Sequence, residues 1–211
     1  IFYSNWIKKI NALKNKILKY FKDKASRYQE LSGQGLWGWQ RNRERKAVFD
    51  LLGSLEGREV LDLGCGTGYY ARYALSRNAQ HVVGVDISPS MIAGLPKKQV
   101  TGLVDQAETI TFPRNFSRIL SAGLLEFVAE PQVLLENARK QVSSDGILVI
   151  LLPEDNFFGR IYRQFHRLHG FEIKLFSMDS IIAHAETAGW TYSCSRVVFP
   201  FSLVFKFTAS L

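Results

Sequence analysis

A glycine-rich segment that follows an apolar run holds the residue types best suited to contact a nucleoside. Gly64, Gly66 and Gly68 alternate with other residues, and an acid, Asp62, stands two residues before the first of them. Glycine adopts positive φ angles and lets a ligand reach the backbone without meeting a Cβ atom. A second apolar run ends at Asp86, and a carboxylate at a strand end can bind both hydroxyls of a ribose. The pattern predicts a nucleoside-binding site.

The spacing of the glycines and the acid before them restrict the ligand. Dinucleotide-binding proteins use G-x-G-x-x-G, whereas this chain has G-x-G-x-G preceded by Asp62. A carboxylate repels the dianionic pyrophosphate of a dinucleotide and attracts a ligand that carries an ammonium or a sulfonium. These residues therefore favour S-adenosylmethionine over a dinucleotide.

At these residues the sequence resembles the class I, Rossmann-like methyltransferases that use S-adenosylmethionine. The first motif of that family is an acidic residue followed by G-x-G-x-G, and the resemblance extends over roughly residues 59–211. It implies S-adenosylmethionine as the cofactor and S-adenosylhomocysteine as the product. It also implies a three-layer α/β/α fold with a mostly parallel seven-stranded sheet, strand order 3-2-1-4-5-7-6, and an N-terminal helical lid.

Apolar runs and helical segments alternate from residue 59 onward, as in a mostly parallel sheet covered on both faces. Strands are expected near residues 59–64, 81–86, 100–104, 117–122, 146–152, 191–198 and 201–208. The short connection 199–201 permits only an antiparallel pair, because a parallel pair needs a longer crossover. Ahead of this domain, Gly33 to Trp39 is predicted to be a loop and Arg43 to Leu52 a helix.

The family motifs assign one part of the cofactor to each of three strand ends. Asp62 would attract the methionyl amino group, directly or through water. Asp86 would accept charge-assisted hydrogen bonds from both ribose hydroxyls. Asp105, which follows the third expected strand, would accept a hydrogen bond from the adenine amino group. The backbone would approach the methionyl and sugar parts at Gly64, Cys65 and Gly66.

Side chains farther along the motifs would complete the cofactor site. Ile87 and Met91 fall where the family packs apolar groups against adenine and sugar, and Gln106 would frame the adenine ring. Ser121, at the end of the fourth expected strand, would lie under the sulfonium methyl group. Tyr28 would lie near the methionyl carboxylate, because residues 20–28 look like the tyrosine-rich entry of the family's N-terminal helix.

Simpler explanations stay open at three of these positions. Cys65 could be a catalytic thiol, although a small residue in a tight turn is the favoured interpretation. Ser88 precedes Pro89 and would serve as a helix N-cap with proline in the first turn. Asp105 could be an ordinary turn residue.

The residues after the fourth and fifth expected strands bear on the acceptor. Enzymes that methylate exocyclic amines of nucleic-acid bases place Pro-Pro-aromatic after the fourth strand, and cytosine C5 enzymes place a cysteine there; segment 121–125 has neither. Segment 153–170 is rich in aromatic and apolar residues. It would help to cover a pocket for a lipophilic or planar acceptor. The alternative is an ordinary amphipathic helix packed on the sheet.

Two histidines in that segment are candidate general bases. His166 and His169 are three residues apart, so a helix would place them on one face. His166 is the preferred candidate for the catalytic base. A metal site built on this pair is disfavoured because no further ligands accompany it, and no metal is expected.

The charge excess of the chain lies in its N-terminal quarter. Residues 1–50 hold twelve Lys and Arg against four Asp and Glu, which equals the net charge of +8 of the whole chain. Within them, residues 3–25 have apolar side chains spaced as in an amphipathic helix, with lysines between them. We interpret residues 1–50 as a basic lid segment and residues 51–211 as the S-adenosylmethionine-binding domain. A membrane-surface helix is the second interpretation of this segment and nucleic-acid docking the third.

Composition and cysteine usage set the remaining expectations. With 46% hydrophobic residues, 211 residues suffice for one α/β domain, as a monomer or weak dimer. Two cysteines build no disulfide framework, which favours the cytoplasm, with peripheral membrane contact if the N-terminal helix binds lipid. The leading hypothesis is a methyltransferase for a small, hydrophobic or planar acceptor at O, C or N. The alternatives are an RNA methyltransferase that uses the basic segment and a non-catalytic S-adenosylmethionine-binding partner protein.

Overall fold

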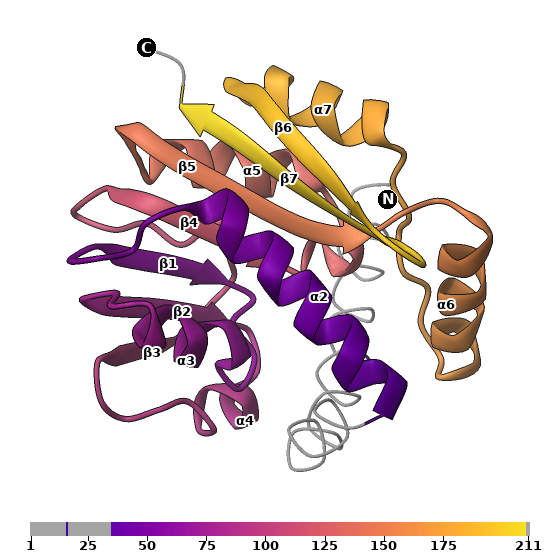
Figure 1. The fold of residues 1–211 in the computed structure, drawn as a ribbon, viewed down its shortest axis with the longest axis horizontal. Coiled ribbons are helices and arrows are strands. Elements are labelled where there is room, and N and C mark those ends of the chain that lie inside the picture. Colours follow the sequence, from indigo (N-terminus) through magenta and orange to yellow (C-terminus); the bar gives the residue numbers. More distant parts are fainter. Residues whose placement is uncertain (1–15, 17–34, 210–211) are drawn as a thin grey trace, which may run out of the picture.

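The structure is a computed structural model that describes Lys16 and residues 35–209. A seven-stranded sheet in the order β3-β2-β1-β4-β5-β7-β6 forms its centre, with helices on both faces (Figure 1). The strands are β1 Glu59–Leu63, β2 His81–Asp86, β3 Val100–Val104, β4 Phe116–Ala122, β5 Val142–Pro153, β6 Trp190–Val198 and β7 Ser202–Ala209. The helices are α2 Gly35–Leu52, α3 Tyr69–Ser76, α4 Pro89–Ile92, the 3-10 helix η1 Leu125–Phe127, α5 Pro131–Lys140, α6 Phe157–Leu168 and α7 Met178–Thr187. This order confirms the predicted fold.

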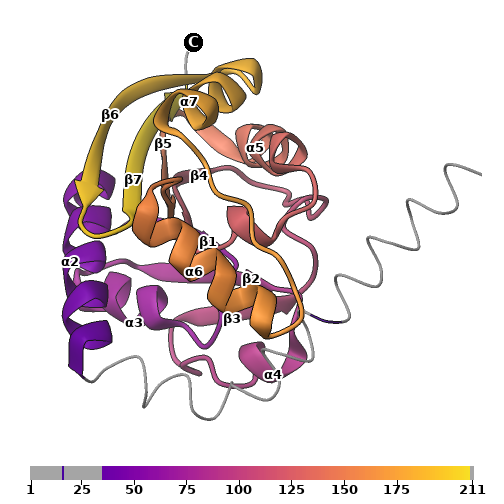
Figure 2. The same ribbon diagram turned by 90° about the vertical axis from the view of Figure 1, so that its right-hand side faces the viewer.

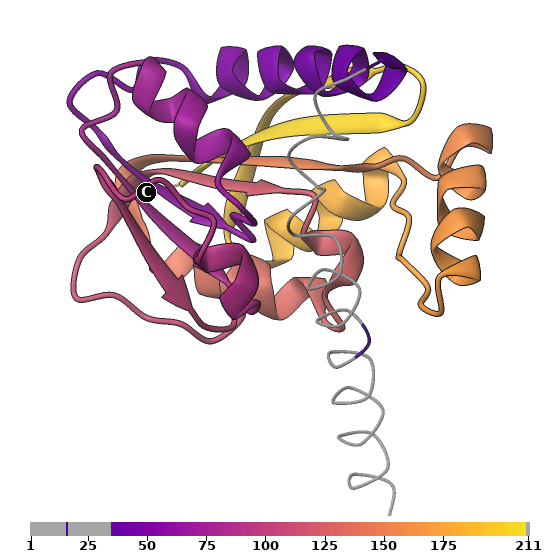
Figure 3. The ribbon, with the colours of Figure 1, turned by 90° about the horizontal axis from the view of Figure 1, so that it is seen from below.

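Each face of the sheet is buried under its own pair of helices. Alternate residues of a strand point to opposite faces, so Val60 and Leu61 of β1 belong to two separate core clusters. Val60 packs with residues of α2 and α3, and Leu61 packs with residues of α5 and α7. Figure 3 shows these two helical layers on opposite sides of the sheet. The hydrophobic pattern of the strands thus decides the three-layer architecture.

The last two strands are antiparallel, as the short connection between them predicts. Tyr192 pairs with Phe207, and Val198 pairs with Ser202 at the turn. β5, by contrast, begins four residues earlier than its sequence indicates. Residues 143–146 have the composition of a turn, but a register shift beside Phe116 keeps them in the strand. Irregular pairing of this kind lets a strand absorb extra residues.

Helix α2 begins within the segment that the sequence predicts to be a loop. The prediction of a loop over residues 33–39 is wrong from Gly35 onward. Tertiary contacts explain the difference: the buried Gln40 amide donates to the Val198 carbonyl, and one turn later Glu44 accepts a 2.6 Å hydrogen bond from the Ser202 hydroxyl. These bonds fasten the helix to the β6–β7 turn and outweigh the low helix propensity of glycine.

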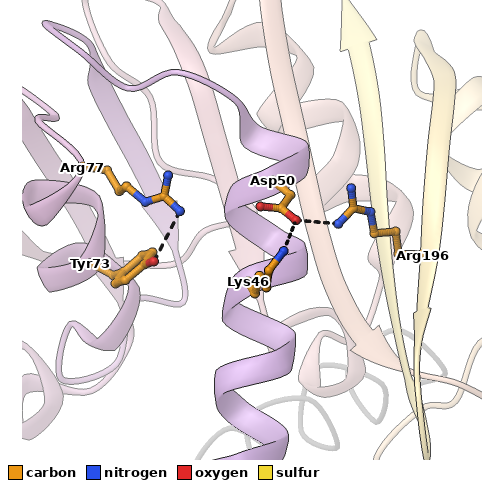
Figure 4. Close-up of polar contacts among 5 residues, drawn as sticks. All are labelled: Lys46, Asp50, Tyr73, Arg77 and Arg196. Atoms are coloured by element: carbon orange, nitrogen blue, oxygen red, sulfur yellow. Dashed lines mark hydrogen bonds and ion pairs between the residues drawn. The ribbon is translucent and has the colours of Figure 1, made fainter.

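Exposed ion pairs orient α2 over β6. Asp50 accepts from Lys46 on its own helix at 3.0 Å and from Arg196 of β6 at 2.7 Å (Figure 4). On the neighbouring helix α3, Arg77 donates to the Tyr73 hydroxyl at 3.3 Å. Exposed pairs contribute at most about 1 kcal/mol each, so they guide the position of α2 while the apolar core supplies most of its stability.

Helix α6 lies apart from the two layers. Figures 1 and 2 show it next to the end of β5 and across the carboxyl edge of the sheet. Among the described residues, no helix has both the length and the hydrophobicity needed to cross a membrane. The predicted basic segment 1–50 falls mostly outside the described residues, which include only Lys16 and residues 35–50 of it.

Candidate active site

The glycine turn after β1 has the positive φ angles that its glycines allow. Gly64, Gly66 and Gly68 all have positive φ, at 74°, 52° and 82°. The backbone N–H groups of Gly64 and Cys65 both donate to the Val85 carbonyl of β2, at 2.8 and 3.0 Å. A Cβ at Gly64 would lie 2.9 Å from Leu124 Cβ, whereas no atom of residues 35–209 lies within 4 Å of the same position at Gly66. The turn is closely packed at its first glycine and open at its second.

Asp86 joins this turn to the end of β2. Its carboxylate accepts from the Gly66 N–H at 2.9 Å and from the Ser88 N–H at 2.9 Å. Burial raises the pKa of Asp86, and the two backbone hydrogen bonds oppose that rise. Each carboxylate oxygen has a second lone pair, so Asp86 can hold the turn and still accept from two ribose hydroxyls.

Asp62 is a buried acid, and no cationic side chain among the described residues lowers its pKa. Its side chain is 2% exposed, and its Oδ2 atom has no hydrogen-bond partner among the described residues. Burial, and secondly the negative charge of Asp86, raise the pKa of Asp62 to about 8. A cationic group placed beside it would favour the charged form, so the site is electrostatically prepared for an ammonium or a sulfonium.

The raised pKa of Asp62 predicts a pH-dependent stability. The folded protein holds this proton up to about pH 8 and the unfolded chain releases it near pH 4, so the stabilisation is complete below the unfolded pKa and is lost as pH rises towards 8. Asp62→Asn mimics the protonated acid, and without ligand it should gain about 3–4 kcal/mol over the wild type between pH 5 and pH 8. Urea unfolding at the two pH values measures this. An equal difference at both values would contradict a protonated Asp62.

The ends of β2 and β3 meet beside this turn. The Asp105 N–H donates to the Asp86 carbonyl at 3.2 Å, and the exposed Asp105 carboxylate accepts from the Gln106 N–H at 2.7 Å. Met91 is buried and Ile87 is half-buried. These residues therefore lie at the same edge of the sheet as Asp62, as the motif order implies.

Two neighbouring positions clarify the alternatives left open by the sequence. Ser88 stands at the N-cap of α4, with Pro89 in the first turn, but its side chain makes no capping bond and lies 2.9 Å from the Ser90 hydroxyl. Cys65 is buried against Gly84. Burial raises the pKa of the Cys65 thiol, and the carboxylates of Asp62 and Asp86 raise it further. The thiol is thus protonated, which disfavours a nucleophilic role.

Glu126, a buried acid at the exit of β4, is not among the site residues predicted from the sequence. Glu126 lies in η1, is 4% exposed, and its Oε2 atom has no hydrogen-bond partner among the described residues. Burial raises the pKa of Glu126 to about 8, and Glu44 of α2 contributes through its negative charge. The signal in the sequence was a lone acid inside the apolar run 124–128. Nearby in the chain, Ser121 is fully buried, and its hydroxyl also has no partner among the described residues.

Glu44 lies in a polar cluster between α2 and the start of β7. Glu44 accepts from Ser202 at 2.6 Å and from Gln40 at 3.1 Å. Burial raises the pKa of Glu44, while these two hydrogen bonds and the charge of Arg41 lower it less strongly. Helix α2 thereby brings a second, half-buried carboxyl group beside Ser202 at the start of β7, close enough to raise the pKa of Glu126. No spacing in the sequence connects residues so far apart.

The two candidate histidines occupy different environments. His166 is 3% exposed, and its ring centroid lies 4.6 Å from that of Tyr162, 5.0 Å from that of Phe171 and 5.8 Å from that of Phe127 in η1. His169 is exposed, follows the end of α6, and its Nδ1 atom lies 2.8 Å from the Phe165 carbonyl oxygen. The two rings therefore lie in different surroundings, and His166 contacts Phe127 in the segment that leaves β4.

The assembled edge suits an adenosyl ligand with a positive charge. Within the described part of the chain, Gly66 leaves room above the backbone, Asp62 Oδ2 accepts no hydrogen bond, and Asp86 has spare acceptor capacity. Ser121 belongs to β4, the strand that pairs with β1 on the side away from β2. Tyr28 lies outside the described residues, so its contact with the cofactor stays a prediction.

Comparison with known proteins agrees with this geometry. Residues 61–150 match the family described as "Methyltransferase domain". The tRNA U34 carboxymethyltransferase of Aeromonas salmonicida is 30% identical over 122 residues, which cover 54% of this chain and 36% of that protein. The malonyl-[acyl-carrier protein] O-methyltransferase of Bacillus cereus is 29% identical over 139 residues, which cover 60% and 51%. The chain thus spans about half or less of the length of these curated relatives.

A solved structure extends the likeness to nearly the whole chain. The magnesium protoporphyrin IX methyltransferase of Synechocystis, with bound S-adenosylhomocysteine, matches with a TM-score of 0.75 at 16% identity, covering 93% of this chain and 100% of that one. At this identity the match establishes the fold. Together with the family match and the strand order, it shows that this chain has the class I, Rossmann-like methyltransferase fold and that residues 61–150 are a methyltransferase domain, whose cofactor is S-adenosylmethionine.

Proposed function

We propose that this protein transfers the methyl group of S-adenosylmethionine to a small, hydrophobic or planar acceptor beside the carboxyl ends of β4 and β5. The observation that carries the proposal is the arrangement of Asp62, Asp86 and Asp105 at three adjacent strand ends around an open glycine turn. Acidic groups in this order fit the ammonium, ribose and adenine of one extended ligand. The acceptor would approach from the side of η1 and α6.

The proposed cofactor contacts follow the sheet edge from β1 to β3. Asp62 would hold the methionyl ammonium, and the backbone at Gly64, Cys65 and Gly66 would lie against the methionyl and sugar parts. Asp86 would bind the ribose hydroxyls. Met91 and Ile87 would pack on the sugar and adenine, with Asp105 and Gln106 at the ring edge. On the other side of β1, Ser121 would lie under the methyl group.

Methyl transfer requires alignment and exclusion of water more than it requires a catalytic group. When bound, the cofactor supplies an electrophilic methyl group. The packed wall formed by Leu124 against Gly64 would exclude water on the β4 side. Glu126, with its raised pKa, would accept the proton that a hydroxyl or amine acceptor loses, and His166 is the alternative base.

The cofactor half of the proposal is tested by titration calorimetry of the full chain with S-adenosylhomocysteine. Saturable binding is expected, and no heat at millimolar ligand would reject it. The acceptor half is tested by supplying S-adenosylmethionine with quinones, tetrapyrroles, polyketides and fatty acyl compounds and measuring S-adenosylhomocysteine release. Cofactor binding without turnover of any acceptor would favour the non-catalytic alternative.

Substitution of the two candidate bases should distinguish their roles once an acceptor is known. A proton-accepting Glu126 must be ionised, so the rate should rise with pH through about 8. Glu126→Gln should lower kcat by about 10²–10⁴-fold and abolish this rise, whereas His166→Gln should retain it. The measurement is kcat and KM from pH 6 to pH 9.5. Loss of the rise in the His166 variant alone would assign the base to the histidine instead.

An RNA acceptor is the second candidate function. It is favoured by the charge excess in residues 1–50 and by relatives named as tRNA U34 carboxymethyltransferases. Phosphate contacts make RNA affinity fall steeply with salt. Filter binding of tRNA between 50 and 300 mM salt, which spans roughly the range where such losses are large, decides between the two. Affinity that is absent or insensitive to salt rejects the RNA acceptor.

A further inference from the structure

Helix α6 presents an unusually apolar face to solvent. Phe157 is 71% exposed and Leu168 is 79% exposed, and Ile161, Phe165 and Phe158 lie between 42% and 54%. Residues spaced by three or four lie on one side of a helix, so positions 157, 161, 165 and 168 form a continuous stripe. Four exposed apolar side chains in a row are not an ordinary surface feature.

The stripe continues onto two neighbouring elements. The ring of Phe158 lies 5.5 Å from that of Phe199 in the β6–β7 turn, which is itself 59% exposed. Arg43 of α2 donates to the Phe199 carbonyl and stacks over the ring of Trp39, which is 53% exposed. We call this set the α6 surface; its members are Trp39, Phe157, Phe158, Ile161, Phe165, Leu168 and Phe199.

The inner face of α6 packs against aromatic residues at the carboxyl edge of the sheet. His166 and Tyr162 face the interior, where they contact Phe171, Phe127 and Phe201. The inner face is thus satisfied by aromatic contacts at the carboxyl edge of the sheet. The apolar stripe lies on a different side of the helix and is exposed to solvent.

Basic residues accompany the stripe. α6 contains Arg160, Arg163 and Arg167 and no acidic residue, and the helix is followed by His169. Arg160 pairs with Asp155 just before the helix, at 2.8 Å. Of the remaining arginines, Arg167 lies on one flank of the stripe, and Arg163, one turn earlier, lies farther round the helix towards its inner face. An apolar face with aromatic residues and a cationic flank is the pattern of a helix that lies in a membrane interface.

We propose that the α6 surface binds anionic lipid bilayers. Its charge complements acidic headgroups, and its Phe, Leu, Ile and Trp side chains suit the boundary between headgroups and acyl chains. A second copy of this chain fits less well, because a two-fold contact would bring the same arginine rows together. The surface is also distinct from residues 3–25, whose predicted lipid contact lies outside the described part of the chain.

The experiment is co-sedimentation of the full chain with vesicles of phosphatidylcholine, with and without 30% phosphatidylglycerol, a fraction that gives roughly the surface charge of a cytoplasmic leaflet. Phe157→Ser with Leu168→Ser should lower affinity for anionic vesicles by about tenfold or more, since two exposed apolar groups no longer insert. Arg163→Gln with Arg167→Gln should lower it by about 30-fold, and high salt should reproduce that loss.

Matched controls use similar side chains far from the α6 surface. Val133→Ser changes an exposed apolar residue of α5, and Lys97→Gln with Lys98→Gln removes two exposed charges before β3. Both should retain wild-type vesicle affinity. Binding that is unaffected by the α6 variants overturns the proposal, as does an effect confined to RNA affinity or to a dimer seen by sedimentation velocity. Circular dichroism verifies that each variant is folded.

Discussion

Replacing Asp86 with alanine is expected to weaken S-adenosylhomocysteine binding by about 1.5–3 kcal/mol, roughly 10- to 150-fold in Kd. The carboxylate is the proposed acceptor for both ribose hydroxyls, and hydrogen bonds to a charged group are the stronger kind. It also anchors the glycine turn through the Gly66 N–H. Both effects act in the same direction on affinity. Titration calorimetry at pH 7.5 measures the change.

Asp105→Ala serves as the control for Asp86. Asp105 lies on the adjacent strand end, is exposed, and bonds only locally to the Gln106 N–H among the contacts described. Removing a solvent-exposed acceptor costs less binding free energy, so Asp105→Ala should weaken S-adenosylhomocysteine binding by less than about 1 kcal/mol. Thermal unfolding without ligand separates loss of the turn from loss of ligand contacts. Equal affinities of wild type and Asp86→Ala would show that the ribose is held elsewhere.

The largest effect on stability is expected from Gly64→Ala. Gly64 has a φ of 74°, which costs an L-residue about 1–2 kcal/mol. The new Cβ would also meet Leu124 at 2.9 Å, and such overpacking adds about 1–3 kcal/mol. We therefore expect the free energy of unfolding to fall by about 2–5 kcal/mol in urea.

Gly66→Ala is the matched control, because it shares the positive φ but meets no atom within 4 Å. Its free energy of unfolding should fall only by the conformational cost of a positive φ, about 1–2 kcal/mol. Its open side is where the cofactor is proposed to approach, so the same variant should lose affinity for S-adenosylhomocysteine out of proportion to its stability. Equal destabilisation of the two variants would contradict the packing difference between the two glycines.

The cofactor turn could be predicted because its determinants are local in the chain. Asp62 and the three glycines lie within seven residues, and Asp86 ends the next strand. Glycine at positive φ and acids at strand ends are requirements of the backbone and of charge. The strand order followed from the resemblance to the family, and the antiparallel last pair from the short connection at 199–201.

Predictions failed where distant residues outweighed local preference. The glycines before Trp39 indicated a loop, but Gln40 and Glu44 fasten the helix to residues more than 150 positions away. Similarly, residues 143–146 have turn composition, but pairing with β4 keeps them in β5. Propensity is a weak prior, and long-range hydrogen bonds and packing override it.

The amino-acid sequence by itself determined the fold class, the glycine turn and the order of acids along the cofactor edge, since each depends on neighbouring residues and on strand ends. Only the tertiary structure decided the environment of Glu126, whose pKa is raised by burial first and, to a lesser degree, by the negative charge of Glu44 on α2. It also decided that α6 turns one aromatic face inward and one apolar face to solvent. Burial and the electrostatic field depend on segments that meet only after folding, and no local spacing records them.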